Sequence, residues 1–321
     1  MSPPPRGNSR TRTKRVAAIK PKRLTILQAQ SLSQLPWLVH GFSTRPGGFS
    51  ACYGGRTLNL SFTQHDSREH VERNRALLLE AIGATFHDGS NWPLAQMKQV
   101  HSSLVHRVRV SRLLPGSGYV PGSDGKIEPL VGDGLITSAA GLLLAVKTAD
   151  CVPVLVADLK CRAVGAFHAG WRGTVARVVE KGIGEMQRHF GSLPGDLRAV
   201  IGPSIRRCCY RVGPELRAEF ESQFSYADEL FEEVFDANAI HVRYPLLFLN
   251  QRAPGHGDLG PEIHLDLVEA NRRQLQDAGL CPEHISVIGG CTACDTVRFF
   301  SHRAEFGRTG RMMAVIGIRP E

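Results

Sequence analysis

The chain has 321 residues, of which 42% are hydrophobic, and a formal net charge of +9 at pH 7. No apolar run approaches the ~18 uncharged residues that a membrane helix requires, so we expect no contact with a membrane. We expect no nucleic-acid partner either, because residues 1–23 hold eight Lys or Arg and no acid, which leaves 31 basic and 30 acidic side chains in the rest of the chain.

Residues 1–29 are predicted to form a basic, Pro- and Arg-rich disordered tail, because they offer too little apolar surface to offset the entropy cost of ordering. The tail lacks the apolar region of a secretion signal. Without such a signal, eight cysteines in a chain of this length indicate reduced thiols rather than the disulfide framework of small secreted domains. We therefore expect a cytoplasmic protein with one folded domain over residues 30–321.

The first helix is predicted over residues 68–82. Asp66 to Glu69 form a capping-box pattern, apolar side chains follow at helical spacing, and Gly83 ends the helix. The middle of the chain then contains short apolar or β-branched runs bounded by Gly, Asp or Lys, which predict buried strands. These runs are continuous rather than alternating, so both faces of the sheet should be covered. The predicted strands are residues 134–138, 142–146, 152–158 and 163–167.

Helices and strands continue to alternate toward the C-terminus. Thr174 is predicted to cap a helix with one apolar face. Further helices are expected to begin at Gly213-Pro214 and at Asp266, the second ending near Gly279. These elements predict one α/β domain with helices outside the sheets. The remaining predicted strands are residues 284–289, 297–301 and 312–318, and residues 245–261 are expected to form a long loop.

Three metal-binding side chains, His101, Cys151 and His168, lie at the edges of predicted strands. Imidazole and thiolate are donors that Zn²⁺ prefers, and three protein ligands leave a fourth position for water or substrate. No local spacing connects the three residues, so residue type and spacing also allow Cys151 to be a buried small hydrophobic residue.

Segments rich in Gly and Arg near these residues could hold an anion such as phosphate. His168-Ala-Gly-Trp-Arg-Gly-Thr174 combines a strand, a Gly-containing turn and a helix start beside Arg172, although the glycines also suit a simple tight turn. Arg45, before Gly47 and Gly48, is a second candidate, and Arg303 is a third.

The remaining cysteines offer a different possibility. Cys291 and Cys294 form a CxxC, which together with Cys208 and Cys209 could make a structural zinc site or a redox pair. The spacing is not that of a paired zinc ribbon, so it favours buried thiols.

These residues lie in motifs that resemble the laccase-domain family, also called the multicopper polyphenol oxidase or purine nucleoside phosphorylase family, which includes bacterial peptidoglycan editing factors. The chain departs from the family pattern at Arg211, His302 and Ala304. The motifs occur in order as HGFSTRPGG, LNL, QVHS, GDGLIT, TADCVPVL, HAGWRGT, IGPSI, CCYRVG, CT, FFSHR and TGR.

The resemblance implies a four-layer αββα sandwich of two mixed sheets in a single α/β (α+β) domain. It implies that His101, Cys151 and His168 bind one metal ion and carry the catalysis. The implied activities are phosphorolysis of adenosine, inosine and methylthioadenosine and deamination of adenosine, so the expected substrates are a purine nucleoside and phosphate. Bacterial members are also linked to removing wrongly incorporated residues from peptidoglycan precursors.

We expect zinc at this site to activate water for deamination, while Arg45 or Arg172 positions phosphate for phosphorolysis. Asp133 and Asp150 are candidates for binding substrate or moving a proton, and Asp150 could instead orient a ligand His. Asn59 in the LNL motif and Arg303 complete the candidate substrate-binding residues.

Three alternatives remain open from the sequence. Two His and one Cys also bind copper in oxidases, although the chain has no His-x-His pair. Cys151 could act as a nucleophile with His101 or His168 as base, in a hydrolase for an amide such as a peptidoglycan precursor. A fourth protein ligand would instead make the metal purely structural.

Overall fold

The structure, a computed structural model, describes residues 24–109, 119–121, 127–234 and 261–321. Of the predicted tail, residues 1–23 lie outside the described residues. Of the predicted loop at 245–261, only residue 261 is described.

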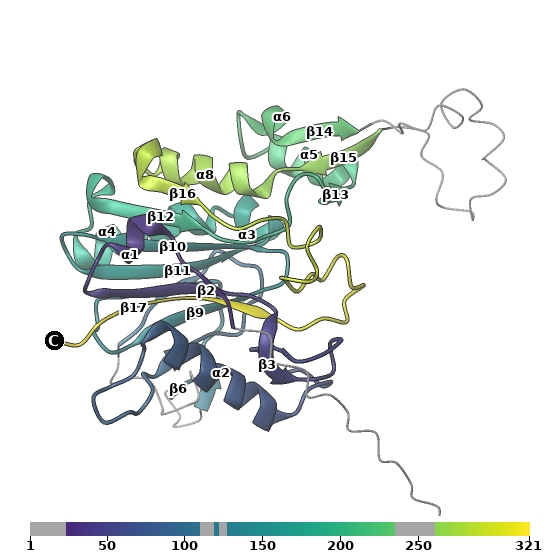
Figure 1. Cartoon of the computed structure of the whole chain (residues 1–321). Coiled ribbons are helices and arrows are strands. Elements are labelled where there is room, and N and C mark those ends of the chain that lie inside the picture. The colour runs from purple at the N-terminus through teal and green to yellow at the C-terminus, as the bar shows by residue number, and fades with distance from the viewer. Residues whose placement is uncertain (1–23, 110–118, 122–126, 235–260) are drawn as a thin grey trace, which may run out of the picture.

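Two mixed sheets form the centre of the molecule (Figure 1). In the five-stranded sheet only the β4–β9 pair is parallel, and in the six-stranded sheet the parallel pairs are β12–β16 and β5–β8. In spatial order, the first sheet contains β1 (Ile26–Leu27), β2 (Leu38–Ser43), β17 (Met312–Ile318), β9 (Leu143–Thr148) and β4 (Leu94–Ala95). The second contains β16 (Ile285–Val287), β12 (Leu197–Ile201), β10 (Val152–Asp158), β11 (Ala163–Ala169), β8 (Gly134–Thr137) and β5 (Val105–Arg107).

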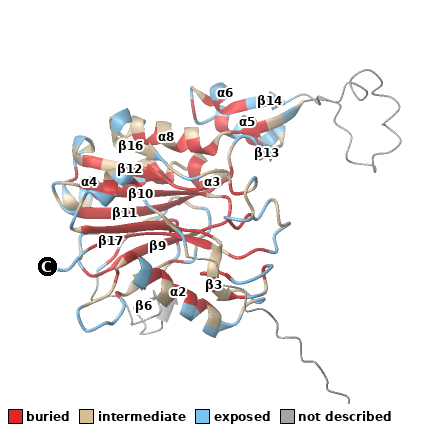
Figure 2. Cartoon of the chain, in the orientation of Figure 1, coloured by how far each residue is buried: buried red, intermediate tan, exposed pale blue. Residues whose placement is uncertain are grey.

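Helices cover the outer faces of both sheets, which confirms the predicted four-layer sandwich. The helix α2 (Arg68–Ile82) packs on the five-stranded sheet, and α4 (Val178–Phe190) and α8 (Leu267–Asp277) pack on the six-stranded sheet. Side chains such as Leu144 and Leu155 fill the space between the sheets. Figure 2 shows that the central strands, such as β10, β11 and β17, are almost entirely buried, as their continuous apolar sequences predict, whereas edge strands such as β16 are partly exposed.

Smaller elements surround this frame. A three-stranded sheet, in the order β13-β15-β14, and a two-stranded sheet, β6-β7, add to the two large ones. Their bounds are β13 (Arg211–Val212), β14 (Phe231–Val234), β15 (Glu262–Leu265), β6 (Tyr119–Pro121) and β7 (Ile127–Pro129). The other elements are α1 (Gln30–Ser33), β3 (Pro46–Ser50), α3 (Trp171–Val175), α5 (Pro214–Glu221) and α6 (Ala227–Leu230), with 3₁₀ turns at Pro194–Asp196 and Pro282–His284.

Local signals predicted several helix ends correctly. The Ser67 side chain accepts a hydrogen bond from the His70 amide at the start of α2, and Gly83 adopts the left-handed conformation that ends it. Pro214 opens α5, and Asp266 caps α8 by accepting a bond from the Glu269 amide.

The prediction that Thr174 caps a helix is wrong. Thr174 lies inside the short helix α3, and its hydroxyl accepts a hydrogen bond from the Asn271 amide of α8. The chain then breaks at Arg177, which has a left-handed φ of 60° and forms the N-cap of α4. The Thr174 hydroxyl oxygen, which the local pattern predicted to cap the helix, therefore makes a tertiary contact with α8 instead.

Two further expectations need correction. Residues 297–301 form a turn rather than a strand, and the apolar Phe299 and Phe300 are buried there by packing against Tyr53 and Met312. The folded body also begins before residue 30, because β1 pairs with β2 and Ala29 is buried.

Candidate functional site

The antiparallel pairing of β10 with β11 brings the first two site residues together. Val152 pairs with Ala169 and Pro153 pairs with His168. Cys151, which immediately precedes β10, therefore lies beside the end of β11, where His168 is buried. Residues 17 positions apart in the sequence become neighbours through strand register.

His101 completes the group from the loop between β4 and β5. Its Nε2 lies 3.8 Å from the Cys151 sulfur, and its ring centroid lies 5.1 Å from that of His168. One donor atom from each of the three residues lies within 4.8 Å of the others. The structure thus assembles the His101, Cys151 and His168 set expected from the sequence.

Gly170 gives this group its space. A Cβ atom on Gly170 would lie 2.7 Å from Cδ2 of His101 and 3.0 Å from the Cys151 sulfur, closer than ordinary van der Waals contact. The glycine at the end of β11 is therefore required for the close approach of two site side chains, rather than for an unusual φ.

One buried carboxylate, Asp133, positions both histidines. Its Oδ1 lies 2.9 Å from Nδ1 of His168. Its Oδ2 accepts hydrogen bonds from the amides of Val100 and Ser102, which flank His101, and from the Ser102 hydroxyl. His101 itself has a left-handed φ of 60°, a strained conformation that these two amide bonds hold in place.

The hydrogen bond to Asp133 also sets the chemistry of His168. Nδ1 is the hydrogen-bonded nitrogen, which leaves Nε2 as the donor atom facing the group. Burial alone would raise the pKa of Asp133, but hydrogen bonds from His168 and Ser102 lower it to about 2. Asp133 is therefore a fixed negative charge behind the site.

The charges within the group stabilise one another. Burial acts to raise the pKa of the Cys151 thiol, but His168 and His101 hold it at about 6. Burial acts to lower the pKa of His168, but Cys151 and Asp133 hold it at about 9. The site thus favours a thiolate, the form of cysteine that binds metals and attacks electrophiles.

The donor set fits a tetrahedral metal ion. Zinc places its sulfur and nitrogen ligands about 3.5 Å apart, close to the observed 3.8 Å between Cys151 and His101. His101 is exposed to solvent, so a fourth position on that side is accessible. Within the described ranges, the only other group of metal-competent His, Cys, Asp or Glu is a set of four cysteines. The described residues therefore contain no second histidine cluster of the kind that a multicopper centre requires.

Asp150 orients a loop rather than a histidine. It has a left-handed φ of 95°, and its carboxylate accepts bonds from the hydroxyls of Thr292 and Ser301 and from the Arg303 amide. Because Asp150 precedes Cys151, these bonds fix the turn from which the thiol projects. Among the described residues, the Asp150 carboxylate has no hydrogen bond to a histidine that would support the alternative role of orienting a ligand His.

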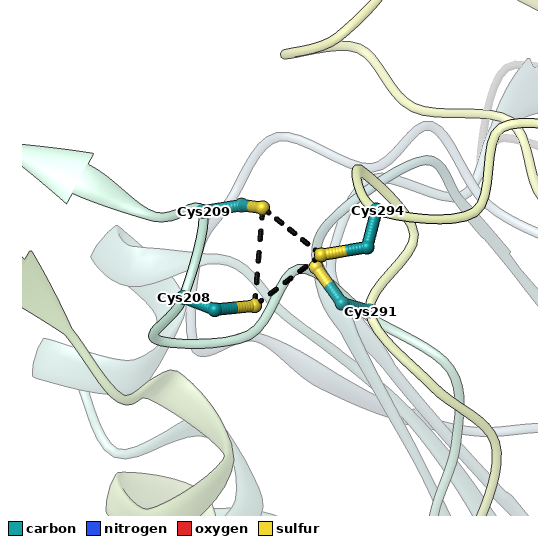
Figure 3. A group of neighbouring side chains, drawn as sticks. All are labelled: Cys208, Cys209, Cys291 and Cys294. Atoms are coloured by element: carbon teal, nitrogen blue, oxygen red, sulfur yellow. Dashed lines mark hydrogen bonds between the residues drawn. The ribbon is translucent and has the colours of Figure 1, made fainter.

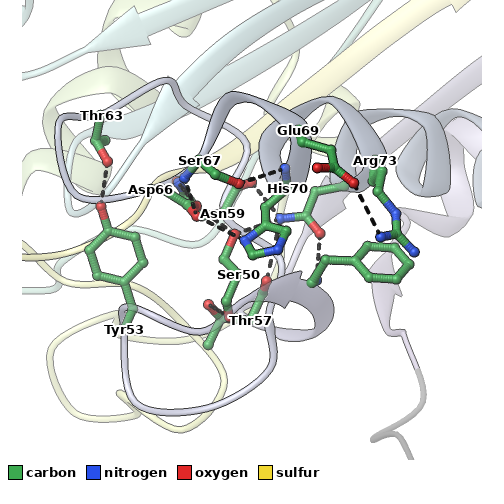
Figure 4. Close-up of polar contacts among 12 residues, drawn as sticks. Ser50, Tyr53, Thr57, Asn59, Thr63, Asp66, Ser67, Glu69, His70 and Arg73 are labelled. Carbon is green, nitrogen blue, oxygen red and sulfur yellow. Dashed lines mark hydrogen bonds and ion pairs between the residues drawn. The ribbon is translucent and has the colours of Figure 1, made fainter.

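Arg45 and Asn59 are engaged in contacts within the fold. The Arg45 guanidinium donates to the carbonyls of Tyr53 and Thr296 and pairs with Glu305 at 2.9 Å. Asn59 is fully buried and belongs to a polar network that joins residues 50–66 to α2 (Figure 4). Its amide donates to Ser61 and Asp66 and accepts from Ser61 and Arg311. These contacts favour structural roles for both residues.

Arg172 and Arg303 lie nearer to the metal-binding group. Both guanidinium groups are close enough to Tyr210 to affect its pKa, as are Cys151 and Asp150. Both side chains are exposed. Arg303 lies over the Tyr210 ring and donates to the Arg211 carbonyl, whereas Arg172 stacks on Trp171. Among the described residues, the Arg172 guanidinium has no hydrogen bond or ion pair with another side chain or carbonyl, so Arg172 is the candidate cation that is more available to an anion.

Comparison with known proteins gives the family. Over residues 39–319 the chain matches the family described as multi-copper polyphenol oxidoreductase laccase. The chain belongs to this family. A purine nucleoside phosphorylase of Deinococcus radiodurans is 34% identical over 300 residues, which cover 92% of this chain and 93% of that protein. The purine nucleoside phosphorylase YlmD of Bacillus subtilis is 33% identical, with 88% of this chain and 89% of that protein covered.

Solved structures agree with this assignment. The crystal structure of the hypothetical protein YfiH of Bacillus licheniformis has a TM-score of 0.73 and 31% identity, covering 92% of this chain and 96% of that one. The resemblance inferred from the motifs is confirmed, and the enzyme names of the relatives support an enzymatic role. No helix in the described part of the chain is long and apolar enough to cross a membrane.

The sequence did not single out three residues that shape the site. Gly170 lies in the motif around His168, and Tyr210 lies in the CCYRVG motif, but neither has a residue type that signals a role. Ser102 follows His101 and contacts Asp133 twice. Burial raises the pKa of Tyr210 to about 12, with Cys151 adding to the effect, so its hydroxyl is a neutral hydrogen-bond donor beside the group.

Proposed function

We propose that the chain is a zinc-dependent purine nucleoside enzyme, which cleaves adenosine, inosine and methylthioadenosine by phosphorolysis and deaminates adenosine. The observation that carries this proposal is the convergence of His101, Cys151 and His168, with Asp133 behind His168. The relatives named purine nucleoside phosphorylase support the substrate class.

The three residues would hold Zn²⁺ through the sulfur of Cys151 and one nitrogen of each histidine. Zinc bound there supplies a Lewis acid that activates water or polarises an oxygen of the substrate. The protein supplies the orientation, because Asp133 fixes the ring of His168 and the backbone on both sides of His101.

In this proposal, Arg172 binds phosphate. In phosphorolysis a phosphate oxygen forms a bond to C1′ of the ribose while the bond from C1′ to the purine nitrogen breaks, and that nitrogen takes up a proton. Arg172 is exposed near the group and can offer its planar donor fork to phosphate. The neutral hydroxyl of Tyr210 can donate a hydrogen bond to the substrate.

Asp133 and Asp150 act as positioning residues in this account. Both are buried, and each carboxylate already accepts hydrogen bonds from at least three protein donors. Their contacts orient His168, the backbone around His101 and the turn before Cys151. A proton shuttle would instead need an oxygen directed toward the substrate.

The test is to strip the purified protein of metal, reload it with zinc, and incubate it with adenosine and phosphate. Chromatography should detect adenine with ribose 1-phosphate from phosphorolysis and inosine from deamination. His101→Ala should abolish both reactions, whereas His87→Ala, at an exposed residue in a distant turn, should leave both rates unchanged. Absence of both products with the reloaded protein, or full activity of His101→Ala, would contradict the proposal.

A second candidate is a cysteine hydrolase for an amide, such as a bond in a peptidoglycan precursor. It is favoured by the order of contacts in the group, because His168 lies between the Cys151 thiol and the Asp133 carboxylate. The thiolate would attack the carbonyl carbon, the amine would leave with a proton from His168, and water would release the acid from the thioester. Hydrolysis that survives chelation and is lost on alkylation of Cys151 would favour this candidate over the zinc enzyme.

A further inference from the structure

Four cysteines from two distant segments meet at the surface of the molecule (Figure 3). Cys208 and Cys209 lie in the turn after β12, and Cys291 and Cys294 lie in the loop after β16. The sulfur of Cys294 is 3.5 Å from that of Cys208 and 3.2 Å from that of Cys209, and the sulfurs of Cys208 and Cys209 are 3.8 Å apart. All four sulfurs lie within 4.8 Å of one another.

Three of the sulfur separations, 3.2 to 3.8 Å, are close to the edges of a tetrathiolate metal site. A tetrahedral zinc ion with bonds of about 2.3 Å separates its sulfur ligands by about 3.8 Å. A disulfide would require a sulfur separation of about 2.05 Å, and each of the four cysteines is a free thiol. Four sulfurs directed at one point are suited to an ion at their centre, as the orientation of the side chains in Figure 3 shows.

We call these four cysteines the tetrathiol cluster, and one of them, Cys291, has a backbone donor and a cation close to its sulfur. The sulfur of Cys291 accepts a hydrogen bond from the Arg206 amide at 3.4 Å. The Arg206 guanidinium is also close enough for favourable electrostatic interaction with Cys291 and Cys208. Amide donors and a nearby cation stabilise thiolates, the form of cysteine that binds metals.

The two segments are also fixed to each other without the metal. Ser204 and Cys291 form a parallel bridge, and the Thr292 amide donates to the Ser204 carbonyl at 3.1 Å. The sulfurs are therefore held close by the fold itself, which reduces the entropy cost of binding an ion.

We propose that the tetrathiol cluster binds a structural Zn²⁺ ion, separate from the group at His101, Cys151 and His168. Four protein ligands fill the tetrahedron and leave no position for water or substrate, so the ion stabilises structure and takes no part in catalysis. Binding releases the thiol protons to solvent and involves no redox step.

Zinc at the tetrathiol cluster would stabilise one particular loop. The loop from Cys291 to Arg303 carries the hydroxyls of Thr292 and Ser301 and the Arg303 amide, all of which bind Asp150. Asp150 in turn precedes Cys151. Zinc at the tetrathiol cluster would therefore hold the loop that supports the turn presenting the Cys151 thiol.

The experiment uses the full chain with His101→Ala, so that zinc at the other group does not obscure the result. This protein should retain about one zinc ion per chain, and X-ray absorption should show four sulfur neighbours at about 2.3 Å. Adding Cys208→Ser and Cys294→Ser should remove this zinc, whereas Cys281→Ser, a half-buried cysteine outside both groups, should retain it.

The result does not depend on folding of the serine variants, because the metal content and sulfur coordination are measured on protein with all four cysteines. Removing zinc from that protein should also speed amide hydrogen exchange at Thr292 and Arg303. Three results would overturn the proposal: a protein with four free thiols and no metal, a disulfide among the four cysteines in a non-reducing mass spectrum, or zinc with nitrogen or oxygen neighbours. None of them bears on phosphorolysis or deamination by the wild-type chain.

Discussion

Asp133 Oδ1 lies 2.9 Å from Nδ1 of His168, while the other oxygen of the same carboxylate holds the amides on both sides of His101. A single buried charge therefore determines the ring orientation of His168 and the backbone conformation of His101. This relationship explains how residues on a strand and on a loop reach one point with defined geometry.

The first prediction concerns this carboxylate. Asp133→Asn should weaken zinc binding at the His101, Cys151 and His168 group by about 10–100-fold, because the amide is neutral and fixes His168 less well. Competition with a chromophoric chelator measures the affinity. Asp158→Asn is the matched control, since Asp158 is equally buried and accepts two backbone amides at the opposite end of β10. An equal loss of affinity in both variants would show that the effect is general destabilisation.

The second prediction concerns the space beside the metal ligands. Gly170→Ala should reduce zinc content and activity together, because its Cβ would displace His101 or Cys151. The cobalt-substituted protein offers a direct measurement, since its visible spectrum reports tetrahedral geometry. An unchanged spectrum and affinity would mean that the two side chains can move without loss of the site.

The third prediction uses a glycine with free space. Gly184 lies in α4, where an added Cβ meets nothing within 4 Å. Gly184→Ala should raise the free energy of unfolding by about 0.5–1 kcal/mol, because alanine loses less backbone entropy in a helix. Urea denaturation measures the change, and lower stability would contradict the helical environment. The same variant controls for glycine substitution in the Gly170 experiment.

The fourth prediction distinguishes Arg45 from Arg172, both of which the sequence analysis named as candidates for binding phosphate. Arg172→Ala should raise the KM for phosphate with little change in stability, because its guanidinium is exposed. Arg45→Ala should instead lower the free energy of unfolding by about 2–3 kcal/mol, because two carbonyls lose their donor and the partly buried Glu305 loses its cation, although Glu305 keeps its bonds from Ser301 and Thr309. Steady-state kinetics and urea denaturation of both variants test this contrast, which would be reversed if Arg45 bound phosphate.

The fifth prediction concerns acid stability. His40 is buried, which lowers its pKa to about 4, and its Nε2 accepts a hydrogen bond from the Ala29 amide. The unfolded chain takes up this proton near pH 6.5 and the folded chain only near pH 4. Protonation of His40 therefore costs no stability well above pH 6.5, and it lowers the free energy of unfolding by about 3 kcal/mol by pH 4.

The measurement is the free energy of unfolding of wild type and His40→Gln between pH 7 and pH 4. Glutamine does not titrate, so the difference between the two proteins should shrink as the pH falls. Parallel curves would show that His40 is not the group responsible.

The sequence determined most helices and strands because their signals are local. The cap at Ser67, the left-handed Gly83 and the continuous apolar runs of β10 and β11 each act within a few residues. The predictions of a helix cap at Thr174 and of a strand at residues 297–301 were wrong for the opposite reason. A hydrogen bond from Asn271 and the burial of Phe299 and Phe300 are tertiary effects, which short patterns do not contain.

Sequence and family resemblance together also named His101, Cys151 and His168, since few side chains bind metals well. Only the tertiary structure decided how the site is built. Strand register brings Cys151 to His168, and one Asp133 carboxylate serves both histidines. The sequence allowed a zinc site from the four cysteines of the tetrathiol cluster but favoured buried thiols, which is wrong, because Cys208 and Cys294 are exposed. Only the tertiary structure shows that segments more than 80 positions apart meet there, because contact between distant segments follows from chain topology and packing rather than from local spacing.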